Sequence, residues 1–166
     1  GAHYVRDAEG PVAATITPQH LLYNRNAIFT GGLQPHYYCL PVLKREIHRE
    51  ALIQAATSGS NRFFMGTDSA PHARTLKEQS SGCAGCYSGL HALELYAQAF
   101  EMVGKLDQLE GFTSFHGPDF YGLPRNTETV TLKRERFTVP NALPFVNGDT
   151  LVPLAAGTEL NWSFAG

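Results

Sequence analysis

The sequence lacks long hydrophobic runs, strong charge of either sign, internal repeats and low-complexity segments. No stretch approaches the roughly 18 consecutive apolar residues of a membrane-spanning helix, and no signal peptide opens the chain. The formal net charge of −2 gives no electrostatic footprint for nucleic acid or a membrane surface. We therefore predict a protein that binds neither nucleic acid nor a membrane.

Cysteine is also scarce, and its count is odd. Three cysteines cannot all pair within one chain, which together with the missing secretory signal favours a reducing, cytoplasmic location. The 166 residues, of which 43% are hydrophobic, are enough to bury one core. We therefore expect residues 1–166 to form a single domain or a fragment of one.

The strongest local pattern is Phe63-Phe64-Met65-Gly66-Thr67-Asp68-Ser69-Ala70-Pro71-His72. An apolar, β-prone run stops at the carboxylate of Asp68, and His72 follows just beyond a proline. This pattern is typical of a buried parallel strand that presents an acid at its carboxyl end, where α/β barrels and open α/β sheets place their chemistry. Asp and His together can move a proton or hold a metal. The alternative is a helix that begins at Asp68 or Ser69, with His72 on its surface.

The first half of the chain predicts one βαβ unit. Ala13–Thr17 and Arg62–Thr67 are predicted strands, and Leu43–Thr57 between them is a predicted amphipathic helix. Such a unit is normally parallel and right-handed. No clean element is expected from Pro18 to Pro41 or from His72 to Cys86. The apolar residues of the predicted helix recur every four positions: Leu43, Ile47, Ala51 and Ala55.

The second half predicts one further helix and a small sheet. Gly89–Val103 has helical periodicity, and Gly111–Pro124 predicts short helical turns broken by Gly117-Pro118. Thr127–Val139 and Leu160–Phe164 each predict a strand, and we expect the two to pair as an appended sheet.

The residues of the central pattern resemble a known family. Gly66-Thr67-Asp68-Ser69-Ala70-Pro71-His72, followed by Lys77, is similar to a signature of the dihydroorotases of the amidohydrolase superfamily, in particular the single-function bacterial type. The similarity covers nearly the whole chain in the family's order and spacing. It continues through Pro35-His36-Tyr37-Tyr38-Cys39-Leu40-Pro41, Gly82-Cys83-Ala84-Gly85-Cys86, Gly117-Pro118-Asp119-Phe120-Tyr121-Gly122-Leu123-Pro124 and Asp149-Thr150-Leu151-Val152-Pro153.

The resemblance implies an α/β fold that is the carboxyl-terminal part of a TIM (β/α)8 barrel. Ala13–Thr17 and Arg62–Thr67 would be the seventh and eighth of its strands, so the chain would hold about two barrel strands with helices plus a small appended β element. The family's metal site also uses a His-x-His pair, a carboxylated lysine and two histidines from earlier strands. His-x-His occurs nowhere in this sequence, and the chain begins past the position expected for the last of these histidines.

The implied activity is the reversible cyclisation of N-carbamoyl-L-aspartate to dihydroorotate in pyrimidine biosynthesis. By resemblance, Asp68 is the catalytic acid–base group and contacts one zinc of a binuclear pair, with the remaining ligands outside this chain. His72 would bind the substrate carboxylate, and Leu40 and Ala84 would bind the pyrimidine ring edge through their backbone. The partner is then a small-molecule substrate, and the intact enzyme is expected to be a homodimer. Because one carboxylate cannot hold a catalytic zinc, we expect this chain alone to be inactive.

Two alternatives remain open. One is another cyclic amidohydrolase, of the hydantoinase or allantoinase type. The other is a small metal-binding or interaction module built on Cys83-Ala84-Gly85-Cys86, with Cys39 as a candidate further ligand; the same CxxC could instead be redox-active. The remaining histidines show no ligand spacing, so we expect surface or packing roles for them: His20, His36, His48, His91 and His116.

Overall fold

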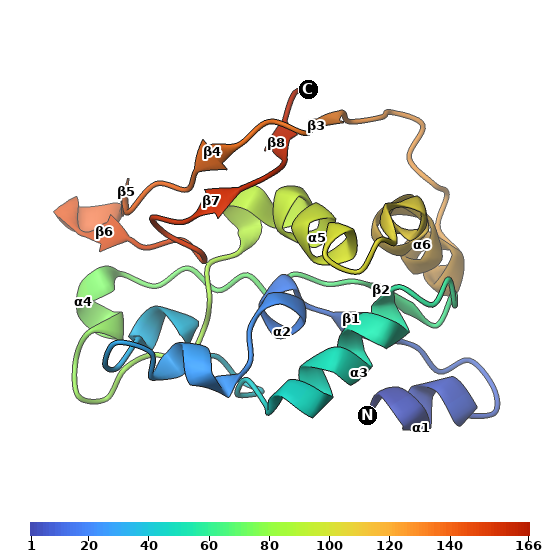
Figure 1. Cartoon of the computed structure of the whole chain (residues 1–166), viewed down its shortest axis with the longest axis horizontal. Helices are drawn as coiled ribbons and strands as arrows, with labels where there is room; N and C mark the ends of the chain where they lie inside the picture. The colour runs from blue at the N-terminus through green and yellow to red at the C-terminus, as the bar shows by residue number, and fades with distance from the viewer.

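The computed structural model describes residues 1–166 and combines short helices with strand pairs (Figure 1). The helices are α1 (Ala2–Asp7), α2 (Pro18–Leu22), α3 (Glu46–Ala56), α4 (Arg74–Lys77), α5 (Ala92–Glu101) and α6 (His116–Tyr121). The strands are β1 (Ala14–Ile16), β2 (Phe63–Met65), β3 (Leu132–Lys133), β4 (Phe137–Thr138), β5 (Leu143–Pro144), β6 (Thr150–Leu151), β7 (Glu159–Leu160) and β8 (Ser163–Phe164).

The predicted βαβ unit is confirmed. β1 and β2 are parallel and pair only with each other, with Ala14 opposite Phe63 and Ile16 opposite Met65. Because the strands are parallel and in register, the segments that follow Ile16 and Met65 emerge at the same edge of the sheet. That edge carries the residues that sequence analysis singled out.

The predicted face of the connecting helix is partly wrong. α3 begins at Glu46 rather than Leu43, and Leu43 is buried in the extended segment before it. Ile47 lies in the first turn with 61% of its surface exposed, whereas Ile53 and Ala56 are buried. The predicted repeat was counted from Leu43, which lies outside the helix. It therefore assigned Ile47 to the buried face, although Ile47 is exposed.

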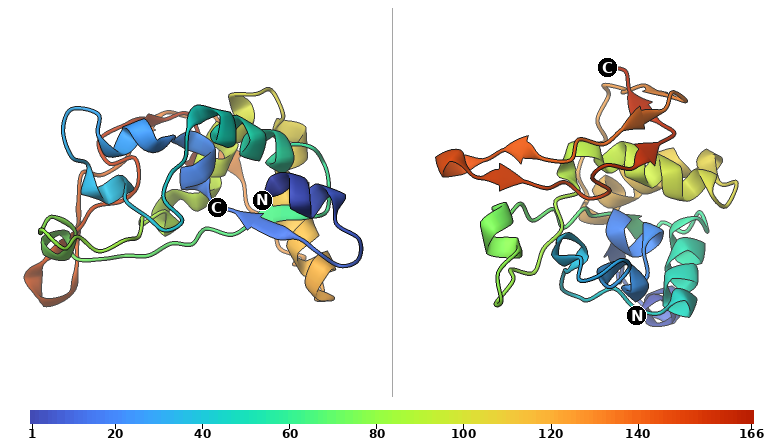
Figure 2. Two further views of the ribbon diagram at one scale, coloured as in Figure 1. Left: turned by 90° about the horizontal axis from the view of Figure 1, so that it is seen from below. Right: turned by 60° about the vertical axis from the view of Figure 1, so that its left-hand side comes forward.

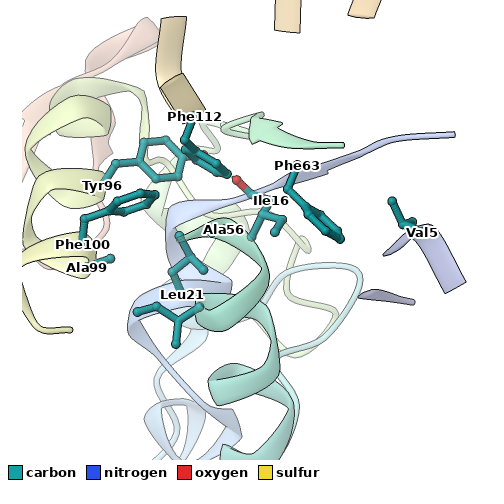
Figure 3. Packing of buried hydrophobic residues seen from close by; sticks show 10 residues of the cluster. Val5, Ile16, Leu21, Ala56, Phe63, Tyr96, Ala99, Phe100 and Phe112 are labelled. Atoms are coloured by element: carbon teal, nitrogen blue, oxygen red, sulfur yellow. The ribbon is translucent and has the colours of Figure 1, made fainter. Parts of the chain in front are cut away.

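The main core lies where β1, β2, α2, α3 and α5 meet (Figure 3). The rings of Tyr96 and Phe100 from α5 pack against Phe112, with centroid separations of 5.4 and 5.2 Å. Tyr96 also donates its hydroxyl proton to the carbonyl oxygen of Ile16, at 2.7 Å. A fully buried tyrosine thus fills the core and satisfies a strand carbonyl at the same time.

Three short helices, α1, α2 and α4, were not predicted from the sequence. α2 starts directly after β1, where Thr17 accepts a hydrogen bond from the amide of His20 and Pro18 occupies the first turn. Proline fits that position because its missing N–H has no helical partner there. α4 begins at Arg74, so the alternative of a helix that starts at Asp68 or Ser69 is wrong.

The carboxyl-terminal half differs from the prediction in detail. Gly117-Pro118 does not break a helix but lies in the first turn of α6, where proline is tolerated. The two predicted strands do pair, but each is split in two: β3 pairs with β8 and β4 with β7, both antiparallel. This tail runs above α5 in Figure 1, and Figure 2 shows the β5–β6 hairpin extending from the body beside α4. None of the helices is long and apolar enough to span a bilayer.

Candidate active site

Asp68 lies at the carboxyl end of β2, as predicted, and its carboxylate is free. The residue is exposed and its side chain makes no hydrogen bond or ion pair within the chain. Its backbone has φ +45°, a left-handed conformation that non-glycine residues rarely adopt. Strain of this kind persists where the surrounding structure enforces it.

Two buried side chains hold the peptide just before Asp68. The carbonyl oxygen of Thr67 accepts hydrogen bonds from Gln19 Nε2 at 3.4 Å and from Ser88 Oγ at 3.2 Å. Gln19 comes from α2 and Ser88 from the loop before α5, so both neighbouring segments fix this point. The backbone just before Asp68 is therefore held from two sides, while the carboxylate itself stays unpaired.

His20, for which sequence analysis predicted a surface or packing role, lies between the end of β1 and the loop that carries Leu40. Its Nδ1 lies 2.7 Å from Thr17 Oγ1 and its Nε2 lies 2.8 Å from the carbonyl oxygen of Pro41. Burial lowers the pKa of His20, against the opposing effects of the Pro41 hydrogen bond and nearby Asp68. A neutral ring donates from Nε2 to Pro41 and accepts the Thr17 hydroxyl proton at Nδ1. His20 thereby ties the end of β1 to the loop that carries Leu40.

Leu40 and Ala84 lie on two loops that are hydrogen-bonded to each other. The amide of Gly85 donates to the carbonyl oxygen of Tyr38 at 2.9 Å. Leu40 is 63% exposed, and Ala84 is half-buried. The backbone N–H and C=O groups of both residues make no hydrogen bond within the chain. The structure therefore brings together two unpaired peptide edges at the positions that the sequence singled out.

His72 packs against the second of these loops. A side-chain carbon at Gly85 would lie 3.0 Å from His72 Nε2 and 2.7 Å from Ala70 Cβ, so only glycine permits this approach. The segment after Asp68 also runs beside the same loop, where the amide of Ala70 donates to the carbonyl oxygen of Cys86 at 2.9 Å. His72 is half-buried and has no hydrogen-bond partner in the chain.

The residues of this chain do not form a zinc centre by themselves. No three His, Cys, Asp or Glu side chains lie close enough together to hold a metal ion. A catalytic zinc needs about three protein ligands. Asp68 can supply one carboxylate, so the donor set within this chain does not fit a catalytic zinc.

The three cysteines pack around loops rather than around an open metal site. Cys39 and Cys86 are each buried to 1% exposure, and Cys83 is half-buried. The contact with Cys39, reinforced by burial, raises the pKa of the Cys86 thiol. Cys83 and Cys86 lie on an irregular loop and not at a helix start, which is unlike a redox CxxC motif.

Comparison with known proteins gave matches in sequence and in structure, although no family model matches the chain. The dihydroorotase of Cupriavidus pinatubonensis is 72% identical over 162 residues, which are 97% of this chain and 46% of that protein. The dihydroorotase of Saccharomyces cerevisiae, solved with 5-fluoroorotic acid, is 32% identical with a TM-score of 0.85 over 98% of this chain and 46% of that one. A D-hydantoinase from Thermus sp. shares the fold, with a TM-score of 0.74 over 98% of this chain and 39% of that one, at 15% identity.

The chain thus spans about half the length of the curated relatives that it matches. The α/β fold with one parallel strand pair is consistent with part of a TIM barrel, as the resemblance implied. The similarity to the hydantoinase concerns the fold alone, whereas the similarity to dihydroorotases extends to the sequence. In both sequence and fold, this chain is therefore similar to about half of a dihydroorotase.

Proposed function

We propose that this chain forms part of the active site of a dihydroorotase, which interconverts N-carbamoyl-L-aspartate and dihydroorotate. The observation that carries the proposal is the free carboxylate of Asp68 at the carboxyl end of β2, beside the unpaired backbone groups of Leu40 and Ala84. The sequence identity to dihydroorotases supports it.

Each group has a role that suits its surroundings. When the ring is opened, Asp68 accepts a proton from the attacking water and passes it to the ring nitrogen as the C–N bond breaks; ring closure reverses these transfers. His72 donates a hydrogen bond to the carboxylate of the substrate. The backbone N–H and C=O groups of Leu40 and Ala84 bind the amide edge of the ring, which presents both donors and acceptors.

The proposal places the remaining machinery outside this chain. Zinc, homodimer formation and a cytoplasmic location belong to the whole enzyme, with Asp68 as the only zinc ligand that this chain provides. The chain alone is then inactive, since its donor set does not fit a catalytic zinc.

The test is turnover of dihydroorotate, with added zinc, by the chain alone and by the chain mixed with the complementary portion of a dihydroorotase. We expect activity only in the mixture. Replacement of Asp68 by Asn should abolish that activity, because an amide cannot accept and return the proton, and the loss should fall on kcat rather than KM.

Other outcomes would contradict the proposal. Turnover by the chain alone would show that the site is complete without further ligands. An inactive mixture, together with zinc bound tightly by the chain alone, would instead support the metal-binding module built on Cys39, Cys83 and Cys86.

A further inference from the structure

Lys77 is an almost fully buried lysine to which the proposed mechanism gives no role. It ends α4, and only 3% of its surface is exposed. Its ammonium donates to three backbone carbonyl oxygens: Tyr38 at 3.0 Å, Cys83 at 2.7 Å and Gly85 at 2.6 Å. One side chain therefore joins α4 to both loops that carry the unpaired peptide edges.

The charge of Lys77 is balanced by peptide dipoles rather than by an acid. Its ammonium takes part in no ion pair, and its Nζ lies 5.9 Å from the centre of the Tyr38 ring. Burial lowers the pKa of Lys77, as expected for an ammonium removed from water. A buried charge without a counter-ion is costly, and an apolar side chain would fill the same space without that cost. The three carbonyl oxygens offset this cost by accepting hydrogen bonds from the ammonium, which an apolar side chain could not donate.

Peptide geometry connects these hydrogen bonds to the site. In a planar trans peptide, the C=O and the following N–H point in opposite directions. When Lys77 turns the carbonyl of Cys83 inward, the N–H of the same peptide, which belongs to Ala84, points away from the ammonium. The N–H of Ala84 has no partner within the chain. The same relation holds for Tyr38 and Cys39, one residue before Leu40.

We propose that Lys77 is a positioning residue, whose ammonium holds the 34–41 and 82–86 loops together and orients their unpaired backbone groups for the pyrimidine ring. The identity of the ligand rests on the proposed function, whereas the clamp between the loops is a property of the chain itself. Lys77 acts through Leu40 and Ala84 and does not touch the substrate.

The first test is amide hydrogen exchange of the chain with Lys77 replaced by Met, which has similar length and no charge. We expect exchange of the hydrogen-bonded amides in the two loops, those of Tyr38, Cys83 and Gly85 among them, to rise roughly tenfold or more, since the charged hydrogen bonds of Lys77 hold these loops. Because the amide of Gly85 joins the two loops, its exchange should rise together with that of both. The amides of β1 and β2 should keep their protection. Replacement of the exposed Lys105 by Met is the matched control. Unchanged exchange in the two loops would overturn the clamp.

A second measurement needs no variant and decides the case if the Lys77→Met chain fails to fold. The Lys77 ammonium of the unmodified chain should give a slowly exchanging signal in nitrogen-15 NMR, distinct from those of exposed lysines. A rapidly exchanging Lys77 ammonium would contradict the three hydrogen bonds.

Kinetics of the chain mixed with the complementary portion of a dihydroorotase distinguish a positioning role of Lys77 from a general effect on stability. Backbone contacts with the ring exist in both the ground state and the transition state, so Lys77→Met should raise KM about tenfold and change kcat less than about twofold. An equal fall in kcat would reject this role. A mixture without turnover would overturn the proposed function and the assigned ligand, and exchange would still decide whether Lys77 holds the loops.

Discussion

The carboxylate of Asp68 has no hydrogen-bond partner within the chain, whereas the carbonyl just before it has two, Gln19 and Ser88. The same division holds for Leu40 and Ala84, whose backbone groups are free while their loops are bonded to Lys77. At the scale of residues, the groups that are proposed to take part in the chemistry have no hydrogen-bond partner, whereas nearby backbone carbonyls accept hydrogen bonds from buried side chains. A free polar group is therefore a better guide to this site than a buried one.

Glu46 gives a residue-scale prediction on pH. Hydrogen bonds from Arg49 and from Asn24 lower the pKa of Glu46 to about 2, from an ordinary value of 4.5. Because the folded pKa is the lower one, the contribution of Glu46 to stability is present above pH 4.5 and is lost as the pH falls toward about 2. Replacement of Glu46 by Gln should lower the free energy of unfolding at neutral pH. The difference in unfolding free energy between this variant and the unmodified chain should shrink as the pH falls from 4.5 toward about 2.

Chemical denaturation at a series of pH values measures this effect. Glu110→Gln is the matched control, because Glu110 is exposed and its side chain makes no hydrogen bond in the chain. A stability difference for Glu46→Gln that stays constant down to pH 2 would contradict the assigned cause.

At the scale of elements, β1, β2 and the long helices were predictable, whereas the short helices α1, α2 and α4 and the β5–β6 hairpin were not. β1, β2 and α5 follow from apolar periodicity, which reports burial directly. α2 and α4 have only five and four residues, too few for a period to show. The signal for α2 was the Thr17-Pro18 pair, a cap followed by a first-turn proline, rather than any repeat.

The candidate site residues came partly from the strand pattern and partly from resemblance alone. Asp68 follows from the strand pattern, but the roles proposed for Leu40 and Ala84 use their backbone groups, which no side-chain pattern reports. The contacts of His20 with Thr17 and with the carbonyl of Pro41 could not be predicted from the sequence, because they form only when the loop folds back.

Gly66 gives an element-scale prediction, because it lets β1 and β2 approach each other. A carbon added at Gly66 would lie 2.5 Å from Thr15 Cβ and 2.8 Å from its Cγ2. Gly66→Ala should therefore destabilise the chain by about 1–3 kcal/mol through overpacking. Adding Thr15→Gly removes the clash, so the double variant should recover part of that loss.

The coupling free energy between the two positions is measured by thermal or chemical unfolding of the unmodified chain, the two single variants and the double variant. Gly117→Ala is a suitable control, since its added carbon would meet Phe64 at an ordinary 3.4 Å. Strictly additive effects of Thr15→Gly and Gly66→Ala would argue against direct contact between the strands at this point.

At the scale of the whole molecule, the parallel sheet is incomplete. β1 and β2 have only each other as neighbours, and the remaining strands form separate antiparallel pairs. Side chains satisfy some outward groups: Tyr96 donates to Ile16, and His116 Nδ1 lies 3.1 Å from the carbonyl oxygen of Phe63. These contacts cover single carbonyls and leave the strand edges without a paired strand, as in a barrel sheet that lacks its other members.

We expect the isolated chain to self-associate through these edges, because an unpaired strand edge is a template for pairing with another chain. Sedimentation over a range of concentrations should show mass rising above that of a monomer. Addition of the complementary portion of a dihydroorotase should replace this association with a one-to-one complex, since the same edges would then be occupied. A monomer at every concentration would contradict the expectation, and it would mean that side chains such as Tyr96 and His116 are sufficient to protect the edges. Self-association that persists unchanged with the complementary portion present would place the contact elsewhere on the surface.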